Sequence, residues 1–358
     1  MLSRAWLEVD LGALTRNAAA LGKRAGVPLI PMIKADAYGL GAVQVANALE
    51  ILAPLAYGIA TVAEGEELRS AGIERPIVVF TPLLEEDMRT AHEARLTPTL
   101  GCAEEIHSWK LYGSPYHLSV DTGMARAGLP WREMQSIAAS LESTPPAGAF
   151  THFHSAALDD GSMDEQTKRF CDAIDRLPVR PKILHTDSSA AIVRHDLSPW
   201  NAVRPGIFMY GVGSGATASI QPESVLTLNA RIVELRWIEP GDTVSYDATF
   251  TARSRSLIAT VPVGYADGYP RAASNAGRAI VRGKLIPIAG RVTMDMIMLD
   301  VTNTGAETGD VVTLIGDGTT HDARIDMASL ATLADVSPYE ILTGLRGRIE
   351  RVYKGQST

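Results

Sequence analysis

The sequence lacks the features that mark membrane, secreted and nucleic-acid-binding proteins. No apolar run approaches the ~20 residues needed to span a bilayer. Residues 1–17 contain neither a continuous apolar segment nor a small-residue cleavage site, so we expect no signal peptide. The net charge is -8 with no basic cluster, which argues against nucleic acid or an anionic membrane as a partner. We therefore expect a soluble cytoplasmic protein.

Cysteine is also scarce. Cys102 and Cys171 are isolated and match no metal-ligand spacing, so the sequence predicts no metal site. We interpret both as reduced core thiols, because free cysteine is among the most buried residue types. Apolar residues make up 46% of the 358 positions and charged residues 21%, which is enough for a sizeable core. The length fits one large domain followed by a smaller one.

The first part of the chain alternates between short apolar runs and longer amphipathic stretches. Apolar runs of this length are typical of parallel strands that are buried on both faces. Because helical patterns separate most of them, eight such runs predict an N-terminal (β/α)8 barrel of the TIM type. The runs lie at residues 28–34, 55–61, 76–82, 96–100, 116–123, 148–155, 182–188 and 202–211.

The pattern changes after residue 222. Short strand-like runs are now joined by turn residues, and two helical patterns follow near the end of the chain. This predicts a smaller, mainly antiparallel β domain. We therefore assign residues 1–222 to the barrel and residues 223–358 to the β domain, with residues 1–10 as a candidate for pairing with the second domain.

Polar side chains follow the predicted barrel strands at the end where such barrels carry their active sites. Lys34 ends the first run; a lysine there could bond covalently to a carbonyl compound, although a surface lysine fits the position equally well. Serines after the seventh run and Gly206 near the start of the eighth suit a phosphate site, although ordinary turns explain each one singly. A covalent lysine combined with a phosphate site would suggest pyridoxal phosphate. The polar residues at these positions are Lys34, Asp121, Arg126, His152, His154, His185, Asp187, Ser188, Ser189 and Arg204.

Ten segments, taken in chain order, resemble the alanine racemase family, whose members depend on pyridoxal 5'-phosphate. PMIKADAYGLG at residues 31–41 looks like the lysine motif that holds the cofactor in that family. The resemblance covers nearly the whole chain and implies a barrel followed by a β domain (fold type III), which agrees with the architecture predicted above. The other nine segments are VDTGMARAG, FTHFHSA, HTDSSAA, VRPGIFMYG, VSYDATF, VPVGYADGYPR, IAGRVTMD, PYEIL and RGRIERVY.

The resemblance implies a two-base racemisation in a homodimer with shared active sites. Lys34 would hold the cofactor and act on one face of the substrate Cα, while Tyr265 of the partner subunit would act on the other. One base on each face is the simplest way to remove a proton and return it with inversion. Free lysine and tyrosine have pKa values of about 10, so their surroundings must adjust them. The resemblance assigns this task to a network of His152, His185 and Arg204.

The same resemblance distributes the remaining binding roles. Arg204 would face the pyridine nitrogen and Arg126 would lie on the substrate side. Met294 of the partner subunit would offer a backbone contact to the substrate carboxylate. The expected cofactor-binding residues are Lys34, Tyr38, His152, Ser189, Arg204, Gly206, Ile207 and Tyr339, of which Tyr38, Ser189, Gly206, Ile207 and Tyr339 match the phosphate contacts.

Several positions depart from the family pattern. Ser119 stands where a carbamylated lysine usually braces the substrate-side arginine, so we expect Arg126 to depend on an anion or on another side chain. None of the departures removes a catalytic group, but together they leave the substrate preference open. The other departures are Asp36, Leu40, Ser188 and Thr293.

The expected function is therefore the interconversion of L-alanine and D-alanine, which supplies D-alanine for peptidoglycan. A serine or broad-specificity racemase on the same scaffold is the alternative. A decarboxylase of the same fold type typically has an acidic partner for the pyridine nitrogen, and Arg204 argues against it. A pyridoxal-phosphate carrier protein would resemble the barrel alone, so the β domain argues against it.

Overall fold

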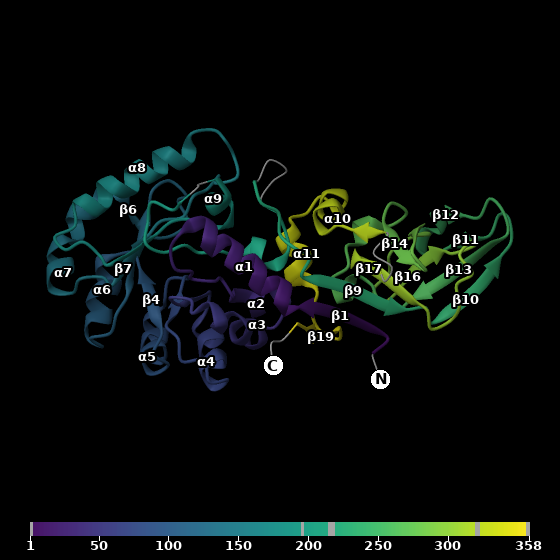
Figure 1. The fold of residues 1–358 in the computed structure, drawn as a ribbon, viewed down its shortest axis with the longest axis horizontal. Helices are drawn as coiled ribbons and strands as arrows, with labels where there is room; N and C mark the ends of the chain where they lie inside the picture. Colours follow the sequence, from purple (N-terminus) through teal and green to yellow (C-terminus); the bar gives the residue numbers. More distant parts are fainter. Residues whose placement is uncertain (1–2, 195–196, 214–218, 319–322, 356–358) are drawn as a thin grey trace.

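The computed structural model describes residues 3–194, 197–213, 219–318 and 323–355, and these form two unequal domains (Figure 1). The larger domain holds a parallel sheet with helices on its outside, and the smaller one is mainly antiparallel. The α/β barrel followed by a β domain is therefore confirmed. The parallel sheet has the order β2 (Tyr57–Ile59), β3 (Ile77–Val79), β4 (Thr97–Leu100), β5 (His117–Asp121), β7 (Gly148–Phe150) and β8 (Ile183–His185), with β6 (Leu129–Pro130) beside β5.

The first and eighth predicted strands close this sheet into a barrel, but they do so through isolated bridges. Leu29 bridges Val203, and Met32 bridges Gly58 on β2. Prolines interrupt both segments, and a proline has no N–H to extend a ladder. The eighth run also ends earlier than expected, because its last part forms the 3-10 helix η3 (Ile207–Tyr210).

The helices that connect the barrel strands lie on the outside of the barrel. Asp10 accepts a hydrogen bond from the Ala13 N–H and so begins the first helix, which ends at Gly26 in a left-handed conformation. No helix in the described ranges has the length and apolar content needed to cross a membrane. The helical segments of this domain are α1 (Leu11–Ala25), α2 (Lys34–Gly39), α3 (Ala42–Leu49), η1 (Glu50–Leu52), α4 (Val62–Ser70), α5 (Glu85–Glu93), α6 (Ala103–Lys110), η2 (Trp131–Ile137), α7 (Ala138–Ser143), α8 (Ser162–Asp175) and α9 (Ser189–Arg194).

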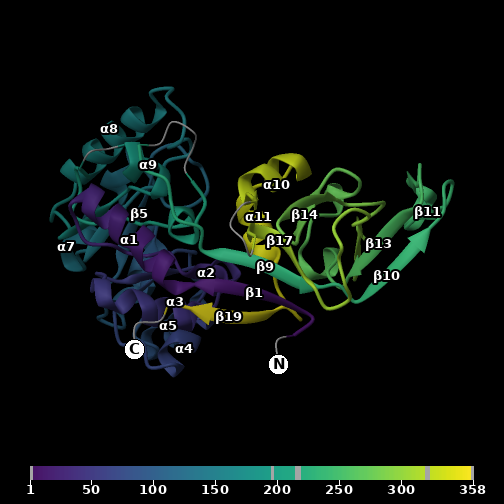
Figure 2. The same cartoon turned by 45° about the vertical axis from the view of Figure 1, so that its right-hand side comes forward.

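Both ends of the described chain enter the main sheet of the second domain. Strand β1 pairs antiparallel with β9 and parallel with β19, as Figure 2 shows beside the helices of the barrel. The main sheet has the order β15, β14, β17, β9, β1, β19, with β18 beside β17; a second sheet is β10, β13, β16, and a third is β11, β12. The strands are β1 (Ala5–Asp10), β9 (Leu226–Arg231), β10 (Glu234–Ile238), β11 (Thr243–Val244), β12 (Phe250–Thr251), β13 (Ser256–Val261), β14 (Arg278–Val281), β15 (Lys284–Pro287), β16 (Ile297–Asp300), β17 (Val311–Asp317), β18 (Arg324–Ile325) and β19 (Glu350–Lys354).

Two helices near the end of the chain, α10 (Met327–Ala334) and α11 (Pro338–Gly344), lie between the barrel and the β domain in both views. A capping box holds the start of the second helix. The Ser337 side chain accepts a hydrogen bond from a backbone N–H of the first turn, and the Glu340 side chain accepts one from the Ser337 N–H. Three short 3-10 helices complete this domain: η4 (Tyr246–Ala248), η5 (Tyr265–Asp267) and η6 (Arg271–Ala273).

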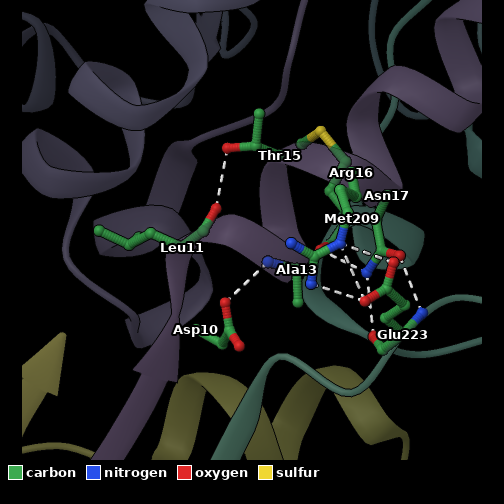
Figure 3. A network of polar contacts seen from close by, with 8 residues as sticks. All are labelled: Asp10, Leu11, Ala13, Thr15, Arg16, Asn17, Met209 and Glu223. Atoms are coloured by element: carbon green, nitrogen blue, oxygen red, sulfur yellow. Dashed lines mark hydrogen bonds and ion pairs between the residues drawn. The ribbon is translucent and has the colours of Figure 1, made fainter. Parts of the chain in front are cut away.

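A polar network anchors the segment that leaves the barrel for β9 (Figure 3). The buried side-chain amide of Asn17 on α1 donates to the Glu223 carbonyl at 3.0 Å and to the Met209 carbonyl at 3.3 Å, and its oxygen accepts from the Glu223 N–H at 2.8 Å. Arg16 adds a two-pronged contact to the Glu223 carboxylate. The first barrel helix therefore fixes where the chain passes into the second domain.

The two cysteines do not lie in the core as predicted. Both are free; Cys171 is exposed on α8 and Cys102 is partly exposed before α6. On α8 the buried position belongs to the neighbouring Phe170, and adjacent helix residues point about 100° apart. An isolated cysteine therefore says little about burial unless its helical face is known.

Candidate active site

A cavity of about 300 Å³ lies at the carboxyl end of the barrel strands. Its volume falls at the lower limit of the roughly 300–1,000 Å³ that is typical of small-molecule sites. Nine of the predicted site residues line it, so the barrel half of the expected site is assembled within one chain. The lining residues are Met32, Lys34, Tyr38, Phe80, Arg126, Phe150, His152, Ser188, Ser189, Arg204, Gly206, Ile207 and Tyr339.

Lys34 begins an unusual backbone turn. The four residues after it, at 35–38, all have φ between 51° and 57° and ψ between 32° and 53°, which is a left-handed helical conformation. None of them is glycine, and this conformation costs L-residues roughly 1–2 kcal/mol each. Strain of this size persists only where the surrounding structure enforces it, and it is concentrated at functional sites.

Contacts from helix α4 and strand β19 enforce the left-handed turn. The Glu64 carboxylate accepts from the Ala35 N–H through one oxygen and from the Ala60 N–H through the other, both at 2.7 Å. From the end of the chain, Arg351 donates to the Gly39 carbonyl at 2.7 Å. Tyr353 donates to the carbonyl of the next residue, 40, at 3.1 Å. Strand β19 and helix α4 therefore fix the direction from which the lysine enters the cavity.

The surroundings of Lys34 favour its neutral amine. Burial lowers its pKa below the ordinary value of 10.5, and the positive charge of Arg126 lowers it further. Glu64 acts in the opposite direction and Arg204 in the same direction as Arg126. A neutral amine is the form that attacks a carbonyl and that accepts a proton.

The other end of the cavity is rich in hydroxyl groups. The Ser189 hydroxyl accepts from the Gly206 N–H at 2.8 Å and from the Phe208 N–H at 3.4 Å. A hydroxyl has two acceptor sites and one proton, so Ser189 keeps its proton for a ligand. The Gly206 N–H, in contrast, is already directed at Ser189. An anionic oxygen bound here would therefore accept a hydrogen bond from the Ser189 hydroxyl rather than from the Gly206 N–H.

Tyr38 and Tyr339 complete the hydroxyl-rich end. The Tyr38 ring stacks on Tyr210 with 4.5 Å between centroids, and Tyr339 approaches it at 5.9 Å. Burial raises the pKa of both cavity tyrosines, so both remain donors at neutral pH. Gly206 faces the Tyr38 hydroxyl so closely that a Cβ would lie 2.7 Å from it. Glycine is required here for the backbone to approach the ring.

Arg204 lies against the opposite wall and packs on both Phe80 and Phe150, whose rings contact each other edge to face at 5.1 Å between centroids. Its NH2 group donates to the carbonyls of Thr151 at 2.8 Å and Thr186 at 3.0 Å, and its NH1 group donates to His185. Among the described residues we identify no hydrogen-bond partner for the Arg204 Nε–H, so this group is available to a ligand in the cavity. Burial lowers the pKa of this guanidinium to about 9, which still leaves it charged at neutral pH.

A chain of histidines extends from Arg204. His185 faces it at 2.7 Å and contacts His117 at 2.8 Å, and His152 faces the same guanidinium at 3.2 Å. Burial and the charge of Arg204 lower the pKa of His117 to about 4, that of His152 to about 3, and that of His185 well below 6.5. All three imidazoles are therefore neutral near pH 7. His152 and His185 accept hydrogen bonds from the Arg204 guanidinium, and His117 is linked to it through His185.

Besides His185, which contacts Arg204 without lining the cavity, two predicted site residues do not reach this cavity within the chain. Tyr265 and Met294 lie on the β domain, where they are 42% and 52% exposed, and neither lines the cavity. They are nevertheless neighbours, because the backbone of the Tyr265 turn binds the carbonyls of Thr293 and Met294. The single chain therefore contains both halves of the expected site, but in separate places.

Several residues at the site were missed by sequence reasoning. Phe80 and Phe150 follow or end barrel strands and contact the Arg204 guanidinium, and Met32 lies near the end of the first run of the barrel. Position at a strand end was a usable signal for all three, but apolar side chains were assigned to the core. Glu64 and His117 gave no such signal. Glu64 lies on helix α4 and His117 begins strand β5, so neither lies at the strand ends that surround the cavity. No group of three or more His, Cys, Asp or Glu that could hold a metal occurs in the described ranges.

Comparison with known proteins covers both domains. Residues 9–214 match the family model for the alanine racemase N-terminal domain, and residues 225–353 match the model for the alanine racemase C-terminal domain. The alanine racemase of Citrifermentans bemidjiense is 38% identical over 373 positions, which cover 98% of this chain and 98% of the relative.

Solved structures agree along the whole length. The alanine racemase of Bacillus anthracis, with bound L-Ala-P, superposes with a TM-score of 0.91 at 31% identity, covering 99% of this chain and 97% of that one. The alanine racemase of Bartonella henselae, with covalently bound pyridoxal phosphate, has a TM-score of 0.90 at 27% identity and covers 99% and 100%. Fold and cavity together define a barrel enzyme of the amino-acid racemase class. The chain belongs to the alanine racemase family.

Proposed function

We propose that this protein interconverts L-alanine and D-alanine with pyridoxal 5'-phosphate bound at Lys34. One observation carries the proposal: a partly buried lysine with a lowered pKa shares a cavity with Arg204 at one wall and with hydroxyl donors at the other. A carbonyl, a ring nitrogen and a phosphate are the three features of this cofactor that those groups suit. The family membership and the cofactor of the Bartonella henselae relative support the same conclusion.

The residues present fit this cofactor. Ser189, Tyr38 and Tyr339 would bind its phosphate through their hydroxyl protons, with the backbone of Gly206 and Ile207 alongside. The Arg204 Nε–H would face the pyridine nitrogen, and the neutral His152 lies against the same guanidinium. When bound, the cofactor supplies stabilisation of negative charge at the substrate Cα.

The protein supplies the two proton-transfer groups. The Lys34 amine would take or return a proton at one face of Cα. Tyr265 of the partner subunit would do so at the opposite face, which gives inversion. Arg126 at the cavity mouth would bind the substrate carboxylate, together with the backbone of Met294 from the partner subunit.

The exposed positions of Tyr265 and Met294 support a homodimer in which each site is shared. The β domain presents the Tyr265 phenol outward, so a second chain could supply the acid/base group for the face of Cα away from Lys34. We further propose that the functional boundary lies near residue 222, next to the Glu223 anchor, with residues 223–358 contributing to the partner's site. The product would serve peptidoglycan synthesis in the cytoplasm.

Two measurements test the proposal. Purified protein should convert L-alanine to D-alanine, and should incorporate deuterium at Cα in D2O, without releasing CO2. Borohydride treatment should fix the cofactor on the Lys34 peptide, as identified by mass spectrometry. A panel of L-amino acids separates alanine from serine or broader specificity, and inversion of none of them would refute the proposed activity.

A further inference from the structure

We propose that Arg348 is the positioning residue that holds together the two turns carrying Tyr265 and Met294, the half of the active site that a partner subunit receives. The inference rests on the proposed shared site and deepens it, because it names the group that builds the contributed half. Arg348 lies between α11 and β19 and does not line the barrel cavity.

The Tyr265 turn depends on a buried carboxylate. Asp267, which is 3% exposed, ends the short helix η5 and accepts a hydrogen bond from the Gly264 N–H at 2.9 Å. This contact closes the turn that carries Tyr265. A buried carboxylate of this kind requires a cationic partner, because an unpaired one is strongly destabilising.

The Tyr265 turn packs directly on the Met294 turn. The N–H of Tyr265 donates to the Thr293 carbonyl and the N–H of Ala266 donates to the Met294 carbonyl, each at 3.0 Å. A Cβ on Gly264 would lie 2.3 Å from both carbonyl oxygens, so glycine is required for this approach. The phenol and the backbone contact expected at the substrate therefore move as one unit.

Arg348 spans the base of that unit. Its Nε donates to one Asp267 oxygen at 2.8 Å, and its NH2 group forms an ion pair with Asp295, the residue next to Met294. One guanidinium thus joins a carboxylate of the first turn to a carboxylate of the second. A planar fork can bind two carboxylates at once, whereas a lysine ammonium is a single point charge.

Loss of this bridge would separate the turns. Asp267 would remain buried without its cation, and Asp295 would add a second negative charge nearby. Displacement of a catalytic group by about 1 Å can lower activity about 10²-fold. We expect Arg348→Gln to lower kcat/KM by about that factor, and Arg348→Lys to retain part of the activity.

Mixed dimers test the proposal most sharply. In a dimer of one Lys34→Ala chain and one Arg348→Gln chain, one site combines an intact Lys34 with an intact Tyr265 unit. That site should work, giving about half of the wild-type activity per dimer. A Lys34→Ala/Tyr265→Phe dimer, purified with two affinity tags in the same way, is the matched reference and should give the same yield.

Each outcome has a defined meaning. Activity in both mixed dimers supports the proposal. Activity only in the reference dimer would show that Arg348 acts on its own barrel, which overturns the proposal and leaves the shared site intact. Failure of the reference dimer would overturn the shared site itself and the inference with it. Wild-type activity in the Arg348→Gln homodimer would also overturn the inference.

A readout without substrate or cofactor completes the test. In the cofactor-free protein, Arg348→Gln should accelerate amide hydrogen exchange in residues 264–268 and 293–296, whereas Arg346→Gln, which removes an exposed charge two positions away, should not. The pair Asp267→Asn/Arg348→Gln removes the buried charge without restoring the bridge to Asp295. It should recover thermal stability but not activity, and recovery of both together would reduce Arg348 to a merely structural role.

Discussion

Arg204 donates a hydrogen bond to Nδ1 of His185 across 2.7 Å, and this contact determines where the proton of the imidazole lies. Because a guanidinium has no acceptor, His185 must carry its proton on Nε2. That nitrogen then donates to Nδ1 of His117 at 2.8 Å. The chain from the cavity into the barrel interior is therefore a row of neutral rings in fixed tautomers that ends on a cation.

This row, together with His152, which faces the same guanidinium, predicts how stability depends on pH. In the folded state the pKa of His117 is about 4 and that of His152 about 3, both below the unfolded value of 6.5. Between these values the unfolded state binds more protons, so the free energy of unfolding falls as the pH drops below 6.5. Each histidine contributes up to about 1.4 kcal/mol per pH unit. Urea unfolding from pH 4.5 to 7.5 measures the slope.

His117→Asn isolates one member of the row. The asparagine oxygen can replace the Nδ1 acceptor facing His185, but it does not titrate. We expect a shallower slope below pH 6.5, by up to about 1.4 kcal/mol per pH unit, with racemase activity at pH 7 largely retained. An unchanged slope would mean that His117 is not held neutral by the fold.

The charges around Lys34 predict the pH dependence of cofactor capture. Only the neutral amine attacks a carbonyl, so the rate at which the cofactor-free protein binds pyridoxal phosphate covalently should rise with pH through the pKa of Lys34. Arg126 lowers that pKa, and its removal in Arg126→Gln should therefore move the midpoint to higher pH. Stopped-flow absorbance follows the capture, and a midpoint that moves to lower pH would reverse our assignment of the charges.

Glu64 should matter for both the turn and the lysine. In Glu64→Gln, an amide NH2 replaces one acceptor, so a backbone N–H of Ala35 or Ala60 loses its partner at a cost of about 1–3 kcal/mol in stability. The midpoint of cofactor capture should move to lower pH, because Glu64 raises the pKa of Lys34. Glu66→Gln on the exposed face of the same helix is the control, and an equal loss of stability there would contradict the role of Glu64.

Gly206 should be intolerant of a side chain. In Gly206→Ala the new methyl group would lie 2.7 Å from the Tyr38 hydroxyl, and the Tyr38 ring is fixed by Tyr210. We expect the Kd for pyridoxal phosphate, measured by equilibrium dialysis, to rise at least tenfold, which is about 1.4 kcal/mol. Gly22→Ala within α1 meets only ordinary contacts with Leu29 and should leave the Kd unchanged. Unaltered binding in Gly206→Ala would show that the hydroxyl-rich end of the cavity does not bind the cofactor.

The sequence predicted the barrel half of the site because its polar residues follow apolar strands. Lys34, Ser189 and Arg204 each lie where a strand ends, and parallel strands bring those ends together. The left-handed turn after Lys34 was not predictable in this way, because three of its four residues, Ala35, Ala37 and Tyr38, have no preference for that conformation. Contacts from Glu64 and from the distant strand β19 impose it.

The second domain was predicted in outline only. Short strand-like runs joined by turn residues indicated antiparallel strands, but β17 was not singled out, and its pairing with β9 depends on partners that are far apart in the sequence. Position within one chain also gave no reason to place Tyr265 beside Met294. That proximity follows from two backbone hydrogen bonds and a glycine, which no periodic pattern reveals.

The central claim is that two bases from two protomers act on opposite faces of one carbon. Exchange of the Cα proton in D2O, measured separately for L-alanine and D-alanine with Tyr265→Phe, tests it most directly. The account predicts that the variant, which keeps Lys34, still exchanges the proton of one enantiomer while exchange of the other is abolished. Equal exchange of both enantiomers, or equal loss of both, would contradict it.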